Sequence, residues 1–421
     1  MKKIFISTML IICLSLNTLA DTYVSSKINS TDSSQRLHSA RKAIDSLVKI
    51  EGKEVSIVDD FKNMFTDAKL SGQVKTIYAG YNYTNQNDIY ATAIGGILKY
   101  ELASLNGFNA GVAVYTSQDL PFATGAGAKQ NSELSSSLGS YTEMAEAYIS
   151  YKYEEFNFRA GRQVLETPLA DSDDIRLISN TFEAYVGTYS FDALEIMAGS
   201  IMSWQGFDTG LETPWVKTGD KGTYFAGVNY NNGIEFKLWY YNITGLCNAL
   251  YFDIGLQYPI KEDIILHTLV QYLNESELNQ STTEATIYGG LFELIVHGIG
   301  FNIAYDKALV NKNKKSFSGV GGGALFTNMD TMILDNIANN SDAEAIVGGL
   351  VYKVSDFGFL YAYGDFVSET AHVTEQDLSI EYSVNDEFIV AGIFVIQEDL
   401  KNKTKTNYDW NRLQLIVNYN F

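Results

Sequence analysis

The chain has 421 residues, a formal net charge of −20 at pH 7 and a mean hydropathy of −0.07. The acidic balance argues against nucleic acid as a partner, because phosphate binding needs basic patches. After residue 20 no apolar run reaches the roughly 18 residues that a membrane-spanning helix needs, which excludes a bundle of such helices. Aromatic residues make up 13% of the chain, with 28 Tyr and 23 Phe against 4 Pro, and this mixture favours β-structure at a membrane–water interface.

Residues 1–20 have the features of a secretory signal peptide. A basic start precedes an apolar stretch from Ile4 to Leu16, and small residues stand at the −3 and −1 positions of a cut after Ala20. Removal of this leader leaves Cys247 as the single cysteine of the exported chain. A disulfide framework and a thiolate metal site are therefore excluded.

The next segment, residues 21–69, is polar and ends in a short amphipathic pattern. Within Ile57 to Ala68, apolar residues recur at helical spacing, namely Val58, Phe61, Met64 and Phe65. This pattern predicts a short helix with one apolar face. If the rest of the chain forms a barrel, as its alternating pattern below indicates, this helix could rest at the periplasmic mouth or enter the lumen.

From about residue 70 onward, apolar and polar residues alternate in runs close to the roughly ten residues of a tilted membrane strand. Such runs include Met144 to Glu154, Ile299 to Tyr305 and Asp377 to Val384. They predict an all-β fold, a single antiparallel transmembrane barrel over residues 70–421 with about eighteen strands. Glu146 and Lys152 would then face the lumen. Four glycines at candidate inward positions would leave room for solute: Gly111, Gly161, Gly199 and Gly364.

The connections between these runs alternate in length. Tight ones fall near Glu154-Glu155, Asn231-Asn232 and Val354-Ser355, among others. The long ones are Ser117 to Thr142, Thr167 to Asn180, Gln205 to Asp220, Lys307 to Asp342 and Asp399 to Asn407. Short periplasmic turns and long external loops are typical of outer-membrane barrels. A barrel of this width holds water, which explains polar inward residues.

The densest polar segment runs from Arg159 to Leu177, out of a strand and into a long loop. Arginine presents a charged, planar donor fork, and basic residues facing loop acids would set a field across a constriction. The candidate constriction residues are Arg159, Arg162, Asp171, Asp173, Asp174 and Arg176. Arg159 and Arg162 have opposite parity, so without a bulge one of them faces lipid or an interface, near the rim. The acidic run could also be a solvated loop or bind calcium, although its spacing is not that of an EF-hand.

The chain ends on an alternating strand, Leu413 to Phe421, that is apolar at one parity and mostly polar at the other. Arg412 and Gln414 would belong to the lumen wall. A final strand that ends on an aromatic residue resembles the C-terminal assembly signal of bacterial outer-membrane barrels. The barrel assembly machinery is therefore an expected partner, through the Phe421 strand.

The middle motif carries a more specific resemblance. Gly161-Arg162-Gln163, Thr167-Pro168, Asp173 to Leu177 and Asn180 to Glu183 resemble the OprD-type outer-membrane porins, especially their relatives in ε-proteobacteria, and the likeness covers roughly residues 58–421. It implies an eighteen-strand barrel whose third external loop narrows the pore. It also implies that Arg162 and Arg176 are wall or constriction residues, with Asp171, Asp173 and Asp174 as loop acids.

The family's solutes are small carboxylates and amino acids, guided by a row of arginines. This chain departs from that pattern, because its barrel region holds only Arg159, Arg162, Arg176 and Arg412. The weak row favours general or mildly cation-selective diffusion.

The sequence therefore predicts a bacterial outer-membrane porin that passes small hydrophilic solutes and ions, without a cofactor and without enzymatic activity. A channel selective for small carboxylates or amino acids stays open as an alternative. A barrel lipase or protease would have His267 and His297 available, but no nucleophile motif accompanies them. An adhesin would use the long loops, and a homotrimer also stays open.

Overall fold

The computed structural model describes residues 57–136, 139–173, 176–206, 209, 215–317, 319–401 and 409–421. The predicted signal peptide, most of the polar segment that follows it, and Asp174 lie outside the described residues. Within the described part of the chain, no helix is long and apolar enough to cross a membrane.

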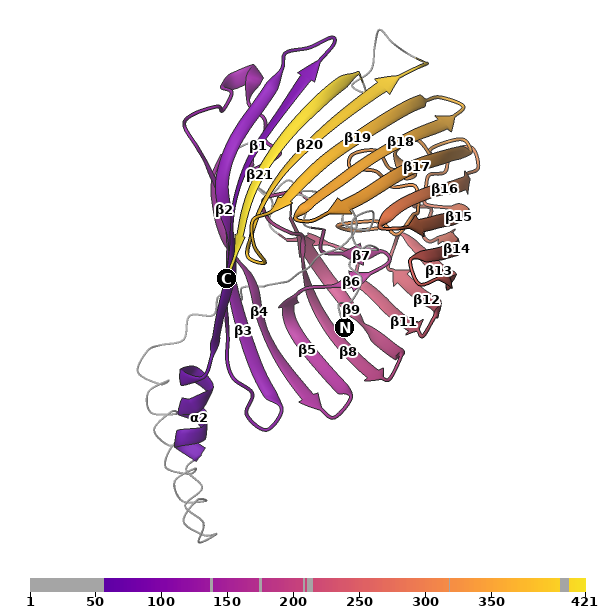
Figure 1. Cartoon of the computed structure of the whole chain (residues 1–421). Coiled ribbons are helices and arrows are strands. Elements are labelled where there is room, and N and C mark those ends of the chain that lie inside the picture. Colours follow the sequence, from indigo (N-terminus) through magenta and orange to yellow (C-terminus); the bar gives the residue numbers. More distant parts are fainter. Residues whose placement is uncertain are drawn as a thin grey trace.

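The described strands form one closed antiparallel sheet (Figure 1). Of its nineteen strands, β10 (Val216–Lys217) has only two residues and pairs with β9, which leaves eighteen wall strands. They are β1 (Lys69–Tyr83), β2 (Ile89–Glu101), β3 (Phe108–Asp119), β4 (Tyr141–Tyr153), β5 (Phe156–Gln163), β8 (Thr181–Phe191), β9 (Leu194–Gln205), β11 (Thr223–Asn231), β12 (Ile234–Ile243), β13 (Cys247–Lys261), β14 (Ile264–Glu277), β15 (Ala285–Val296), β16 (Ile299–Leu309), β17 (Ala343–Val354), β18 (Phe357–Ser368), β19 (His372–Ser383), β20 (Phe388–Asp399) and β21 (Trp410–Asn420). β1 pairs with β21 and closes the ring, which confirms the predicted barrel.

The two faces of the wall differ in polarity. On β21, Leu413 and Leu415 are 40% and 49% exposed on the outer face, whereas Arg412 and Gln414 are fully buried on the inner face. The same alternation recurs on β16, where Phe301 is exposed. Since successive side chains on a strand point to opposite faces, the outer surface is apolar, as lipid requires.

The connections place the short turns at one end of the barrel and the long loops at the other. β4–β5, β15–β16 and β17–β18 are each joined by two residues at the turn end. At the loop end, residues 120–140, 164–180, 206–222, 310–342 and 400–409 join β3–β4, β5–β8, β9–β11, β16–β17 and β20–β21. The loop end also has shorter connections, 84–88, 244–246 and 369–371, so not every external loop is long.

Several small elements lie outside the wall. The helix α2 (Ile57–Thr66), which the apolar spacing predicted, precedes β1. The hairpin of β6 (Glu166–Thr167) and β7 (Ala170–Asp171) lies within loop 164–180 and inside the ring of strands (Figure 1). The 3-10 helices η1 (Gly127–Lys129) and η3 (Leu334–Asn336) belong to loops 120–140 and 310–342.

Loops 120–140, 164–180 and 310–342 fold into the barrel and bury apolar side chains against its inner wall. Leu169 and Met329 belong to one buried cluster with wall residues, and Leu134 belongs to another. A Cβ added at Gly364 would lie 2.2 Å from the sulfur of Met329. The expectation that this inward glycine leaves room for solute is wrong, since it leaves room for a loop.

Gly111 corrects the expectation in the same way. A Cβ added there would lie 2.6 Å from the Tyr148 ring, so this glycine makes space for a wall side chain. Part of the lumen is therefore a packed core.

Candidate pore and its lining

One arginine of the wall binds two of the inward loops and reaches the third through a shared carboxylate. Arg412 on β21 is fully buried, and its Nη1 donates to Glu133 Oε1 of loop 120–140 at 2.9 Å. Its other terminal nitrogen, Nη2, forms an ion pair with Asp330 of loop 310–342. Arg176 of loop 164–180 approaches the same Glu133 oxygen, with its Nε at 3.1 Å. These four residues form what we term the loop hub.

The charges of the loop hub stabilise one another. Burial alone would raise the pKa of Glu133, but Arg176 and Arg412 outweigh it and hold that pKa below its ordinary value. Burial opposes the charge of Arg176, yet Glu133 raises its pKa above the ordinary value. Because both partners keep their charges, the network is an ion-pair cluster inside the protein.

Carboxylates of the wall bind the backbone of loop 310–342. Glu375 on β19 accepts hydrogen bonds from the backbone N–H groups of Thr331 at 2.9 Å and Met332 at 3.2 Å. Asp306 on β16 accepts from the N–H of Thr327 at 2.9 Å and from its hydroxyl at 2.8 Å. Charge-assisted bonds of this kind are stronger than neutral ones. Part of the chain's acidic excess thus fixes a loop.

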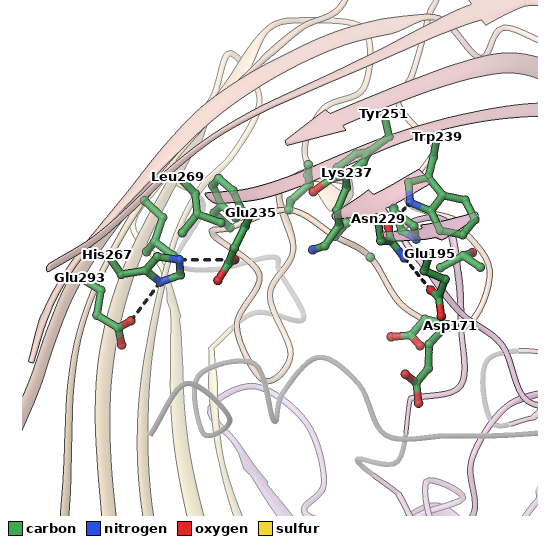
Figure 2. A pocket seen from close by; sticks show the side chains of 18 of the residues that line it. Asp171, Glu195, Asn229, Glu235, Lys237, Trp239, Tyr251, His267, Leu269 and Glu293 are labelled. Carbon is green, nitrogen blue, oxygen red and sulfur yellow. Dashed lines mark hydrogen bonds and ion pairs between the residues drawn. The ribbon is translucent and has the colours of Figure 1, made fainter. Parts of the chain in front are cut away.

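An open cavity of about 410 Å³ remains between the loops and one side of the wall. It is bounded by the β6–β7 hairpin, by loop residues 323–326 and by strands β9 and β11 to β16 (Figure 2). We term it the passage. Its acidic and basic lining residues are Glu166, Asp171, Glu195, Glu235, Lys237, His267 and Glu293.

Both cationic side chains of this lining are in ion pairs. Lys237 Nζ lies 3.2 Å from Asp253 Oδ2 on the neighbouring strand. His267 lies between two carboxylates, with Nε2 3.5 Å from Glu235 and Nδ1 3.4 Å from Glu293 (Figure 2). The lining therefore presents five carboxylates and no excess of positive charge.

A chain of hydrogen bonds positions one of these carboxylates. The buried Trp239 donates from Nε1 to Asn229 Oδ1 at 2.8 Å, and Asn229 Nδ2 donates to Glu195 Oε1 at 3.0 Å (Figure 2). The three residues lie on the adjacent strands β12, β11 and β9. The wall thus holds the Glu195 carboxylate toward the passage.

The β6–β7 hairpin contributes two further acids. Burial raises the pKa of Asp171 to about 7, with Glu166 adding to the effect and the N–H of Ser172 opposing it. Burial, and after it Glu195, raises the pKa of Glu166. The charge of this hairpin can therefore change near neutral pH.

This barrel matches a known protein family. The model of the OprD family of outer membrane porins matches residues 62–421. The chain belongs to the OprD family. It is an outer membrane porin, a passive channel for small solutes in the bacterial outer membrane.

Solved porins share the fold at low sequence identity. OpdK of Pseudomonas aeruginosa, crystallised with vanillate, matches with a TM-score of 0.72 at 16% identity, over 85% of this chain and 99% of that chain. A BenF-like porin from Pseudomonas fluorescens Pf-5 matches with a TM-score of 0.73 at 14% identity, over the same shares. OccAB3 of Acinetobacter baumannii gives 0.72 at 13% identity, again over 85% and 99%. No curated protein sequence matches this chain.

In this OprD porin, Arg159 and Arg162 lie on opposite faces of β5. The guanidinium carbon of Arg159 lies 4.3 Å from the centre of the Tyr148 ring, and Arg159 lines a smaller cavity of about 150 Å³ that shares Glu166 with the passage. Arg162 instead donates to the Met144 carbonyl at 2.7 Å and stacks on Trp215. Arg162 shares its parity on β5 with Phe156 and Phe158, which are exposed on the outer face, so the strand pattern places it away from the lumen.

The other sequence candidates lie in different surroundings. Glu146 pairs with Lys99 at 2.7 Å on the inner wall, while Lys152 is exposed near the turn end of β4. The backbone N–H of Asp173 donates to the Gly321 carbonyl at 3.4 Å, which ties two inward loops together. Gln414 is buried beside Arg412.

Asp174 lies outside the described residues. Of the two described acids of the predicted run, Asp171 borders the passage and Asp173 does not. Among the residues that the structure describes, no group of three or more His, Cys, Asp or Glu side chains is arranged to hold a metal ion.

Sequence reasoning missed most of the passage lining. Glu195, Asn229, Glu235 and Glu293 are single polar residues on strands, and their parity was the one available signal. The parity of a strand residue tells whether its side chain faces the lumen or the lipid. It does not tell which of the lumen-facing side chains are covered by the loops.

Proposed function

We propose that this porin favours cations over anions. The observation that carries the proposal is the passage lining, in which five carboxylates accompany two cationic side chains that are both already paired. A unit charge about 5 Å from a permeating ion contributes roughly 0.8 kcal/mol even at the dielectric constant of bulk water. Several such carboxylates in a narrow path are enough to select by charge.

A reversal potential under a salt gradient tests this proposal. Purified, folded protein in a planar bilayer should give a potential of the sign expected for K⁺ permeating faster than Cl⁻. The double variant Glu235→Gln/Glu293→Gln should move the potential toward zero, because it removes two charges from the lining. Glu262→Gln, at an exposed turn away from the passage, is the matched control. A preference for Cl⁻ in the unmodified protein would overturn the proposal.

Selectivity for small carboxylates is the competing reading, and the placement of the arginines supports it less. Arg412 and Arg176 are in the loop hub, and Arg162 lies on the outer face. Arg159 borders the smaller cavity, which shares the lining residue Glu166 with the passage. Faster permeation of a small carboxylate than of an amine of equal size would favour that reading.

We infer further that the chain has no catalytic activity and that residues 1–20 are a signal peptide, 21–69 an N-terminal segment and 70–421 the porin barrel. Both ring nitrogens of His267 face carboxylates, which supports the first point. An esterase and protease assay tests it, and N-terminal sequencing of the exported protein tests the cut. The nearer relationship to ε-proteobacterial members belongs to the same proposal and rests on the motif at 161–183.

Assembly through the C-terminal strand is also a proposal. The Phe421 N–H donates to the Gly72 carbonyl at 3.0 Å, and the Phe421 ring is exposed on the outside, where assembly machinery could reach it. Deletion of Phe421 should lower the yield of folded protein in the outer membrane. A homotrimer is a hypothesis that chemical crosslinking in intact membranes tests.

A further inference from the structure

The helix α2 is fastened to the outside of the barrel. The Tyr100 hydroxyl donates to the Phe65 carbonyl at 3.0 Å, and the Ala103 N–H donates to the Met64 carbonyl at 2.9 Å. Tyr100 shares its parity on β2 with Leu98, which is exposed on the outer face, while Lys99 between them pairs with Glu146 inside. The last turn of α2 therefore meets the lipid-facing side of β2, at the turn end.

Figure 1 agrees with these contacts, since α2 (indigo) lies outside the ring of strands, near the end at which β1 begins. The helix therefore lies outside the ring of strands and not in the lumen.

The exposed side of α2 carries an aromatic pair. Phe61 and Phe65 lie one helical turn apart, with ring centres 5.4 Å from each other, and are 56% and 48% exposed. Met64, their neighbour on the same apolar face, is buried against the barrel. Two neighbouring phenylalanines facing water would be unfavourable, whereas a short helix with such a face suits the boundary between headgroups and acyl chains.

The same end of the barrel carries other exposed apolar side chains. They are Leu70, Phe108, Tyr153, Phe156, Phe191 and Phe421. Rings at this level form the girdle with which outer-membrane barrels meet the lipid headgroups. The Phe61–Phe65 pair extends this girdle onto the helix. Because the girdle contacts lipid, the exposed aromatic face of α2 should contact lipid as well.

We propose that α2 is an interfacial helix that inserts Phe61 and Phe65 into the periplasmic leaflet of the outer membrane. The partner is a lipid surface. The helix thereby tethers the segment before β1 to the membrane plane beside the barrel. Asp60, Lys62 and Asn63 remain on the aqueous side, in keeping with their exposure. This role is independent of the charge selectivity of the passage.

Site-directed nitroxide labelling tests the proposal in the full exported protein reconstituted in liposomes. Phe61→Cys and Phe65→Cys are compared with Asp60→Cys and Lys62→Cys, each in a Cys247→Ala background, and power saturation is measured with oxygen and with a polar nickel complex. Labels at 61 and 65 should relax faster with oxygen, and labels at 60 and 62 faster with nickel. Retained heat-modifiable migration on gels establishes that each variant is folded.

Equal access of nickel to all four labels would overturn the proposal, because the helix would then lie in water. Spin–spin broadening with exclusion of both relaxing agents at 61 and 65 would also overturn it, since a second copy would then be the occupant. If a cysteine variant fails to fold, Phe61→Trp with brominated lipids gives the same decision. Quenching that exceeds that of Lys62→Trp is expected, and equal quenching contradicts insertion.

Discussion

Removal of Arg412 should open the pore. In Arg412→Gln the loop hub loses the side chain that holds Glu133 and Asp330, which come from two different loops. Breaking a buried ion pair by deleting one partner typically costs about 3–5 kcal/mol, because the other partner is left buried without its counter-charge. Asp330 would bear most of this cost, since Glu133 keeps Arg176.

That free energy is large enough to shift the equilibrium between the packed and the released loop. A shift of about 1.4 kcal/mol changes an equilibrium tenfold, so the loss would convert a rarely released loop into one released for much of the time. Single-channel recording should show higher mean conductance and more open-channel noise in Arg412→Gln. Lys353→Gln, an exposed substitution on the wall, should leave both unchanged.

A compensating variant sharpens the measurement. Arg412→Gln combined with Asp330→Asn removes the unpaired charge, and the noise should fall back toward that of the unmodified protein. Folded Arg412→Gln barrels with unchanged conductance and unchanged noise would refute the reasoning. Loss of heat-modifiable migration would instead place the defect in the wall.

Three further predictions concern the passage and the inward loops. As the pH falls from about 8 to 6, Asp171 should gain a proton, since its pKa is raised to about 7, and the preference for cations should weaken. In Asp171→Asn the reversal potential should lose this pH dependence. Gly364→Leu should lower stability by about 1–3 kcal/mol in urea unfolding, because the new side chain would meet Met329, and an unchanged midpoint would contradict the packing. Asn229→Ala should weaken the preference for cations less than Glu195→Gln does, because the asparagine variant releases the Glu195 carboxylate without removing its charge. An equal loss would mean that the position of the Glu195 carboxylate, and not its charge, decides the selectivity.

The barrel could be predicted from sequence because strand period and membrane thickness constrain every wall residue in the same way. The alternation on β21 and β16 needs no knowledge of distant contacts. The inward loops obey no such local rule. Glu375 and Glu381 share a strand and a parity, yet only the first is reached by loop 310–342 within the described contacts. Glu133 and Arg412 are 279 residues apart, and nothing in either neighbourhood indicates the other.

The arginines illustrate a second limit. Opposite parity already implied that Arg159 and Arg162 could not both face the lumen, but parity alone did not say which one would. In the structure, Arg159 faces the inside of the barrel. Arg162 faces outward, where it donates a hydrogen bond to the Met144 carbonyl and stacks on the Trp215 ring. The family resemblance indicated which residue types to expect at these positions. It did not indicate which face of the sheet each side chain is on, because that depends on the register of this chain's own strands.

The position of the loop hub on the last strand has a consequence for the order of folding. β21 is the last strand of the sheet in chain order, and its pairing with β1 closes the ring. Arg412 on this strand joins loop 120–140 to loop 310–342, through Glu133 and Asp330. Other wall contacts, such as those of Glu375, hold a single loop without β21. The join between the two loops needs β21 in its place, so the interior is complete only when the seam of the barrel is closed.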